Sequence, residues 1–182
     1  MTDTRQERHD SAAETVFKGV KFAVERRSVL TTAGGTALRE VVVHPGAVVV
    51  LPLLDDGRVV MIRNHRFAVG ETLWELCAGT LEPGEPPAET AARELVEETG
   101  YRAEHIEAMT TFYTSPGICD ELMYAFLATG LTHVGQELEE TERIEVELLT
   151  RDAVMRMVEA GEIRDGKTIA TLLYHAAFMR SR

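Results

Sequence analysis

The sequence has no apolar segment long enough to cross a lipid bilayer. Its longest uninterrupted apolar run, residues 47–54, covers eight positions, whereas a membrane-spanning helix needs roughly 20. The N-terminal stretch MTDTRQERHDSAAE lacks the apolar core that a signal peptide requires. We therefore expect a cytoplasmic protein without a membrane partner.

Cysteine is also scarce, which excludes two classes of site. Only Cys77 and Cys119 occur, too few for a disulfide framework and without the spacing of a zinc site. Both are predicted to be free thiols, and no partnering base at a recognisable spacing would make Cys119 a nucleophile. The histidines are equally scattered, without zinc-ligand spacing: His9, His44, His65, His105, His133 and His175.

Basic residues are outnumbered, 19 against 30 acids, and the formal net charge is -11. The acids concentrate in residues 82–98 and 137–147, each with six acids and one arginine. Nucleic-acid binding depends on cationic neutralisation of phosphates. The charge balance therefore predicts no nucleic-acid partner.

The 182 residues, 45% of them hydrophobic, suffice for one core with an appended segment. Residues 1–13 are polar and predicted to be a disordered tail. Residues 14–43 are predicted to form a hairpin: a strand with alternating apolar residues, the turn TTAGGTAL and a second strand, REVVV. A break at His44-Pro45-Gly46 then opens a domain over residues 44–182.

That domain alternates strand and helix patterns. Strands are predicted at residues 47–54, 58–63, 72–76, 106–113, 122–128 and 143–149. Helices are predicted at residues 87–99, 151–160, with Thr150 as N-cap, and 168–179. The pattern indicates an α+β fold, with a mixed β-sheet and helices on both of its sides.

The helix at 87–99 is the most informative segment. Pro86 and Pro87 stand at its start and Gly100 just past its end. With Glu94 at zero on the helical wheel, Glu97 and Glu98 fall at about 300° and 40°. The opposite side, predicted to be buried, holds Ala88, Ala91, Ala92, Leu95, Val96 and Thr99.

Three carboxylates on one helix face repel one another, and an i,i+4 pair of like charges costs about 0.2 to 0.5 kcal/mol. Stability alone therefore does not explain Glu94, Glu97 and Glu98. A hard divalent cation turns that repulsion into ligation, because Mg²⁺ and Mn²⁺ prefer carboxylate oxygens, water and substrate phosphate. The pattern predicts a metal-binding face.

Residues 79–101, GTLEPGEPPAETAARELVEETGY, resemble the Nudix box, G-x5-E-x7-R-E-U-x-E-E-x-G-U with U bulky and apolar. Every specified position is filled. The segment RNHRFAVGETLWELCAG and Pro116, fifteen residues beyond the box, are similar to ADP-ribose pyrophosphatases. Two departures are Cys77, where that subfamily usually has proline, and Asn64, where glutamine is common.

The resemblance implies a Nudix-type α/β/α sandwich and a set of site residues. Metal ligands would be Ala78, through its carbonyl, with Glu94, Glu97, Glu98 and Glu142. Catalytic residues would be Glu140, favoured as the base, with Glu142, Glu97 and Arg93. The alternatives for the base in the same loop, Glu137 and Glu139, stay open. Substrate-side residues would be Arg39, Arg66, Phe17, Phe22, Pro116 and Glu85, with Glu85 and Arg93 orienting loop and helix.

The implied activity is metal-dependent hydrolysis of the pyrophosphate bond of ADP-ribose, giving AMP and ribose 5-phosphate. The expected cofactor is Mg²⁺ or Mn²⁺, with more than one ion at the site. Two alternatives stay open: a broader sugar-nucleotide hydrolase, acting for example on GDP-mannose, and a non-catalytic sensor that binds ADP-ribose. The N-terminal hairpin is similar to the one that these enzymes exchange across a homodimer, so we expect a homodimer.

Overall fold

The structure, a computed structural model, describes residues 13–138 and 143–179. The chain divides into two compact units. The first comprises residues 1–45 and 113–122, and the second comprises residues 46–112 and 123–182.

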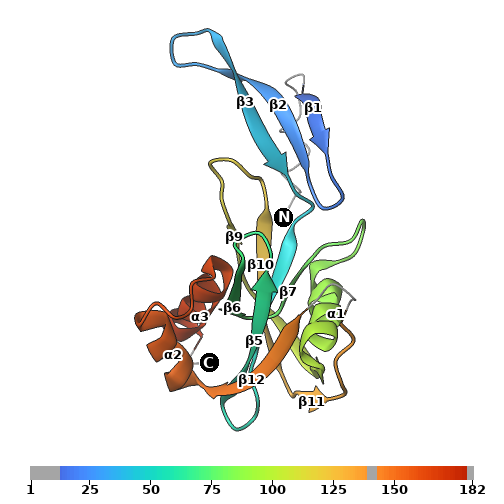
Figure 1. Cartoon of the computed structure of the whole chain (residues 1–182), viewed down its shortest axis with the longest axis vertical. Helices are drawn as coiled ribbons and strands as arrows, with labels where there is room; N and C mark the ends of the chain where they lie inside the picture. Colours follow the sequence, from blue (N-terminus) through green and yellow to red (C-terminus); the bar gives the residue numbers. More distant parts are fainter. Residues whose placement is uncertain (1–12, 139–142, 180–182) are drawn as a thin grey trace. The chain divides into compact units, whose positions relative to one another are not determined.

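The first unit contains an antiparallel sheet of β1 (Ala13–Lys18), β2 (Ala23–Leu30) and β3 (Thr36–Val43), in that order (Figure 1). The prediction of a single strand before the TTAGGTAL turn was wrong. The chain reverses at residues 19–22, where the Gly19 N–H donates to the Phe22 carbonyl at 2.9 Å. The apolar residues on either side of Gly19, Phe17 and Val20, are three positions apart, and the prediction joined them into one strand although a glycine lies between them.

Residues 113–122 join the first unit through β3. The Val42 N–H donates to the Ile118 carbonyl at 2.8 Å, and the Asp120 N–H donates back to the Val42 carbonyl at 3.1 Å. The His44 N–H donates to Asp120 Oδ1 at 2.9 Å. These contacts attach a segment from the middle of the sequence to the N-terminal sheet.

The second unit is built on two sheets. One has the order β7-β4-β10-β9 and the other the order β12-β5-β6, while the two short strands β8 and β11 pair separately. Because β4 and β10 run parallel whereas β4 and β7 run antiparallel, the first sheet is mixed. The bounds are β4 (Ala47–Pro52), β5 (Arg58–Arg66), β6 (Glu71–Glu75), β7 (Ala78–Thr80), β8 (Tyr101–Arg102), β9 (His105–Tyr113), β10 (Leu122–Thr129), β11 (Thr132–His133) and β12 (Ile144–Thr150).

Strand β4 lies at the centre of the core, and all six of its residues are buried. Side chains alternate along a strand, so Val49 and Leu51 join one apolar cluster while Val48 and Val50 join another. The first cluster includes Leu172, and the second includes Leu95. Because both faces of β4 are covered, its residues are apolar without alternation, which explains the continuous apolar run in the sequence.

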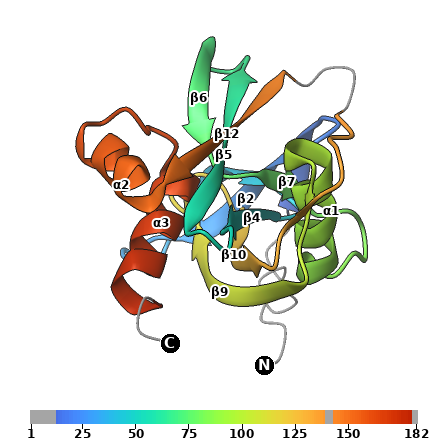
Figure 2. The same ribbon diagram turned by 90° about the horizontal axis from the view of Figure 1, so that it is seen from below.

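Helices cover both faces of this unit, as predicted. Figure 2 shows α1 (Pro87–Thr99) on one side of the strands, with α2 (Arg151–Glu159) and α3 (Gly166–Phe178) on the other. Thr150 is the N-cap of α2, as expected, and its side chain accepts from the Ala153 N–H at 3.2 Å. None of the helices within the described ranges is long and apolar enough to span a membrane.

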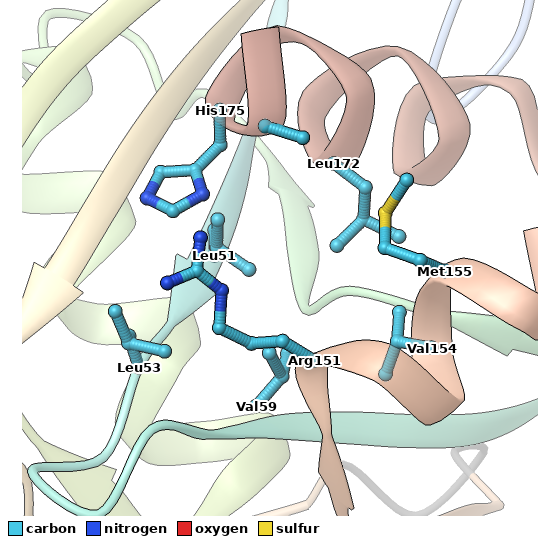
Figure 3. Close-up of a pocket in the computed structure, with 9 residues that line it drawn as sticks. Leu51, Leu53, Val59, Arg151, Val154, Met155, Leu172 and His175 are labelled. Atoms are coloured by element: carbon cyan, nitrogen blue, oxygen red, sulfur yellow. The ribbon is translucent and has the colours of Figure 1, made fainter. Parts of the chain in front are cut away.

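A small pocket lies between α2, α3 and the strands β4 and β5 (Figure 3). Its lining is apolar except for Arg151 and His175: Leu51, Leu53, Val59, Val154, Met155, Leu172 and Ala176. The lining includes no carboxylate. The residues that the sequence predicts as metal ligands therefore lie elsewhere.

The buried face of α1 differs from the predicted one. Glu94 and Glu98 are buried, at 9% and 3% exposure, whereas Ala88 and Ala92 are exposed. The prediction placed the buried face on the side opposite the acids, but here the buried arc is rotated towards the acids and includes Thr90. Polar partners accompany both buried acids: the Ala78 N–H of β7 donates to Glu98, and Arg93 donates to Glu94.

This rotation can be tested with neighbouring alanines. Ala91→Gln inserts an amide into a fully buried position and should lower the free energy of unfolding by several kcal/mol, through overpacking and an unsatisfied polar group. Ala92→Gln, the matched control, should stay within about 0.5 kcal/mol of wild type. Urea unfolding measures both, and equal losses would contradict the assignment of the buried face.

Candidate active site

Helix α1 has well-defined ends, which fix the register of its acids. Pro86 and Pro87 stand at its start, and Gly100 closes it in the left-handed conformation (φ 73°), with its N–H donating to the Val96 carbonyl. Gly100 is therefore a glycine C-cap, since a residue with a side chain would be strained in the left-handed conformation. The predicted bounds of the helix are confirmed.

Two acids of α1 lie against the backbone of β7. The Ala78 N–H donates to Glu98 Oε2 at 2.9 Å. A Cβ added at Gly79 would lie only 1.9 Å from Cδ and Oε1 of Glu94. A side chain at this position would displace that carboxylate, so the glycine at the first position of the box motif makes room for Glu94.

Arg93 is the cationic partner of three acids. Its Nε and Nη2 donate to the two carboxylate oxygens of Glu85 at 3.1 and 3.0 Å. Its Nη1 donates to Glu94 at 2.8 Å and to Glu97 at 2.9 Å. These bonds, with the one to Glu85 foremost, raise the pKa of the Arg93 guanidinium, and the bond from Arg93 lowers the pKa of Glu85 to about 2.

The carboxylates of α1 have the donor chemistry of a hard-cation site, because Mg²⁺ and Mn²⁺ favour oxygen ligands. Within the described ranges, no three His, Cys, Asp or Glu side chains are arranged as a complete metal cluster, and Glu94 and Glu97 are turned towards Arg93. The predicted ligand Glu142 and the predicted base Glu140 lie outside the described residues, as does Glu139.

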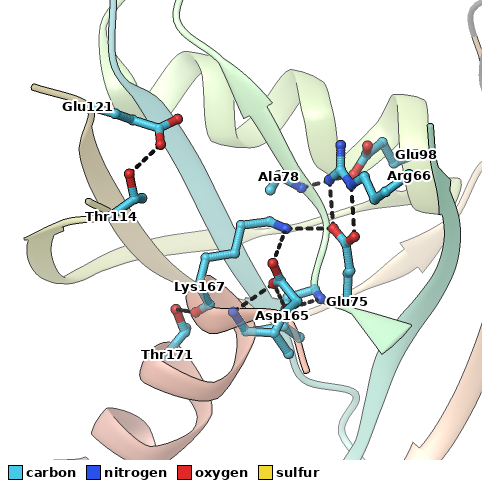
Figure 4. A network of polar contacts seen from close by, with 11 residues as sticks. Arg66, Glu75, Ala78, Glu98, Thr114, Glu121, Asp165, Lys167 and Thr171 are labelled. Carbon is cyan, nitrogen blue, oxygen red and sulfur yellow. Dashed lines mark hydrogen bonds and ion pairs between the residues drawn. The ribbon is translucent and has the colours of Figure 1, made fainter. Parts of the chain in front are cut away.

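Arg66, at the end of β5, lies beside this face (Figure 4). Its guanidinium makes two bonds to Glu75, from Nε at 2.8 Å and from Nη2 at 2.6 Å. The bond to Glu75 is the main cause of a raised pKa of Arg66, and the charge of Glu98 contributes further. Arg66 therefore shares its surroundings with one of the metal-ligand candidates.

The sequence analysis missed two charged residues that lie beside Arg66 in the structure, Glu75 and Lys167. Glu75 is fully buried, and Lys167 Nζ lies 2.5 Å from Glu75 Oε2. One signal was present: an acid inside the apolar run LWELC is out of place in a strand unless a cation accompanies it. Nothing in the local sequence pointed to Lys167, which is 92 positions away.

The remaining substrate-side candidates lie in the first unit. Arg39 and Pro116 are exposed, and Arg39 Nη1 donates to the Leu38 carbonyl at 2.8 Å. The rings of Phe17 and Phe22 lie 6.0 Å apart and are 52% and 44% exposed, so neither is a core residue of this unit. Their part in substrate binding stays a prediction.

The two thiols are free, as predicted. Burial raises the pKa of Cys77 well above its ordinary value, and it raises that of Cys119 as well. A nucleophilic cysteine needs a lowered pKa. Both thiols are therefore unsuited to that chemistry.

The Arg93–Glu85 pair predicts a pH dependence of stability. Because the folded pKa of Glu85 is about 2 against an ordinary value of 4.5, the stabilisation is present above about pH 5 and is lost as the pH falls towards 2. Wild type should exceed Glu85→Gln in unfolding free energy by on the order of 1 to 3 kcal/mol at pH 7. That difference should shrink on acidification, as measured by urea unfolding with a chelator present.

The exposed Glu89, in the first turn of α1, provides the matched control. Glu89→Gln should leave the unfolding free energy near that of wild type at pH 7. A Glu85→Gln deficit that stays constant from pH 7 to pH 3 would contradict the assigned role of the ion pair.

Comparison with known proteins agrees with this geometry. A NUDIX domain family model matches residues 43–172. Over 165 residues, the chain is 41% identical to the ADP-ribose pyrophosphatase of Bacillus subtilis, covering 90% of this chain and 89% of that protein. It is 39% identical to the ADP-ribose pyrophosphatase of Mycobacterium tuberculosis, covering 89% and 80%. The crystal structure of an ADP compounds hydrolase has the same fold, with a TM-score of 0.80 over 91% of this chain and 90% of that one at 23% identity. The chain belongs to the Nudix family.

Proposed function

We propose that this protein hydrolyses the pyrophosphate bond of ADP-ribose, giving AMP and ribose 5-phosphate, in a reaction that requires a divalent cation. The observation that carries the proposal is the position of Glu94 and Glu98, which lie against the Ala78–Gly79 backbone in the unit that also places Arg66. The similarity to two ADP-ribose pyrophosphatases over most of the chain supports the choice of substrate.

Glu94, Glu98, Glu97 and the Ala78 carbonyl would hold the cations, with Glu142 as a further ligand. Mg²⁺ or Mn²⁺ fits this oxygen donor set, and more than one ion is proposed. Bound cations would neutralise the diphosphate and lower the pKa of the attacking water.

The chain's own residues would supply the rest of the chemistry. Arg93 holds Glu85, Glu94 and Glu97 in one arrangement through four bonds, which is a positioning contribution to catalysis. Arg66 would bind the diphosphate, since a guanidinium has five N–H donors and two are used on Glu75. Glu140 is proposed as the base that accepts the proton of the water. Arg39, Phe17, Phe22 and Pro116 are proposed to contact the rest of the substrate.

The test is turnover on a panel of ADP-ribose, GDP-mannose, NADH and diadenosine polyphosphates with Mg²⁺, with products identified by mass spectrometry. ADP-ribose should give AMP and ribose 5-phosphate at the highest kcat/KM. A preference for GDP-mannose would favour the broader hydrolase. Binding of ADP-ribose without turnover of any substrate would refute both hydrolase functions and support the non-catalytic sensor.

Glu98→Gln tests the metal face. It keeps the size of the side chain but removes the charge of a predicted ligand, so kcat should fall by about 10² to 10⁴, the scale for losing an active-site group. The exposed Glu89→Gln on the same helix should keep the wild-type rate. An unchanged rate for Glu98→Gln at saturating Mg²⁺ would remove Glu98 from the ligand set.

A homodimer formed through residues 14–43 is the second part of the proposal. The first unit exposes a set of large apolar side chains that a partner surface would cover: Val16, Phe17, Val20, Phe22, Val29, Leu30 and Leu38. Large apolar side chains exposed in this number on one small unit are the pattern expected of an interaction site.

Leu38→Glu should therefore convert a dimer into a monomer in light scattering at micromolar concentration, because it introduces a charge into that surface. Leu173→Glu, at an exposed apolar position of α3, is the control and should remain dimeric. A wild-type protein that is monomeric under these conditions would refute the dimer.

A further inference from the structure

The cluster around Arg66 forms an ion-pair tetrad of Arg66, Glu75, Asp165 and Lys167 (Figure 4). Lys167 Nζ lies 2.5 Å from Glu75 Oε2 and 2.9 Å from Asp165 Oδ1. Two carboxylates thus face two cations, and the formal charges sum to zero. All four residues belong to the second unit.

Burial within the tetrad is uneven, and the unevenness sets what each member can do. The Glu75 side chain is 0% exposed, and Lys167 is 12% exposed. Arg66 is 40% exposed. A buried carboxylate is costly unless cations and hydrogen bonds accompany it. Among the described residues, Glu75 has two cations as ion-pair partners, Arg66 and Lys167. Of these two, Arg66 is the one with substantial solvent exposure.

The start of α3 holds Lys167 in this position. Asp165 is the N-cap of that helix, and its Oδ2 accepts from both the N–H and the hydroxyl of Thr168 at 2.9 and 2.6 Å. The Leu76 N–H donates to Thr168 Oγ1 at 2.9 Å. The end of β6, which carries Glu75, is therefore fixed to the same helical turn.

We propose that Lys167 is a positioning residue for diphosphate binding: by neutralising buried Glu75, it keeps Arg66 available to an incoming anion. This inference rests on the proposed function, because the diphosphate role of Arg66 is assigned there. Without Lys167, Arg66 alone would have to neutralise Glu75. The local charge would then be negative, with Asp165 close by.

The expected effect is on binding rather than on chemistry. Lys167→Met changes the formal charge of the tetrad from zero to -1, so KM for ADP-ribose should rise about tenfold while kcat changes less than threefold. Lys167→Arg, which keeps the charge, should restore KM to within about threefold of wild type. A purely structural role for Lys167 would lower kcat as well.

Asp165→Asn changes the charge of the tetrad in the opposite direction from Lys167→Met. Asparagine caps helices about as well as aspartate, so the start of α3 is retained while one negative charge is removed, and KM should stay the same or fall. The double variant Lys167→Met/Asp165→Asn restores zero formal charge and should recover most of the lost affinity. If Asp165→Asn raises KM more than threefold, or if the double variant is no better than Lys167→Met, the inference is overturned.

Equilibrium binding of ADP-ribose by calorimetry in a chelator, on the same variants, separates this inference from the proposed function. Wild type that binds in the chelator but hydrolyses nothing when Mg²⁺ is supplied would refute the proposed hydrolase, while the ratios of dissociation constants would still decide the role of Lys167. Should Lys167→Met fail to fold, as circular dichroism would show, the ratios for Asp165→Asn and Lys167→Arg carry the decision. Equal dissociation constants across the folded variants would overturn the inference.

Discussion

The candidate site depends on one contact: two carboxylates of α1 lie against the backbone of residues 78 and 79. Neither acid could occupy a buried position on a helix without a compensating group. The Ala78 N–H supplies one for Glu98, and Arg93 supplies one for Glu94. Gly79 contributes by having no side chain. The contacts that attach the helix to β7 are therefore the same contacts that orient the ligand candidates.

Ion pairs organise the second unit at two places, around Arg93 and around Arg66. In each, an arginine makes two bonds to a single carboxylate, Glu85 in one case and Glu75 in the other. Such paired bonds fix both direction and distance. The acids of a chain with a net charge of -11 are thus divided between a solvated surface and a few positions held by guanidinium groups.

Local patterns were sufficient to predict the elements whose signals are local. The apolar run of β4, the proline start and glycine end of α1, and Thr150 as the cap of α2 each depend on a few neighbouring residues. The box motif likewise identified the acids of α1. The contact partners of those acids could not be predicted locally, because β7 and α1 come together only when the chain folds.

Two of the misses share a physical origin. The turn at Gly19 interrupts the single predicted strand, and the buried arc of α1 includes Glu98, paired with the Ala78 N–H, and Glu94, paired with Arg93. Lys167 reaches Glu75 across 92 positions of sequence. For the α1 acids and for Lys167, tertiary contacts decide where the side chain lies, and neither periodicity nor composition contains them.

The parallel pairing of β4 with β10 has a kinetic consequence. Ala47 is in register with Met123, 76 positions later, so this part of the sheet closes only after a long loop has been ordered. Pairings between distant segments are slow to form because the entropy of loop closure is lost before the contacts are gained. The ligand-bearing helix and the Ala78–Gly79 segment both lie within that loop. During synthesis, the central sheet therefore stays incomplete until the ribosome has passed β10, and until then the apolar strand β4 lacks its parallel neighbour.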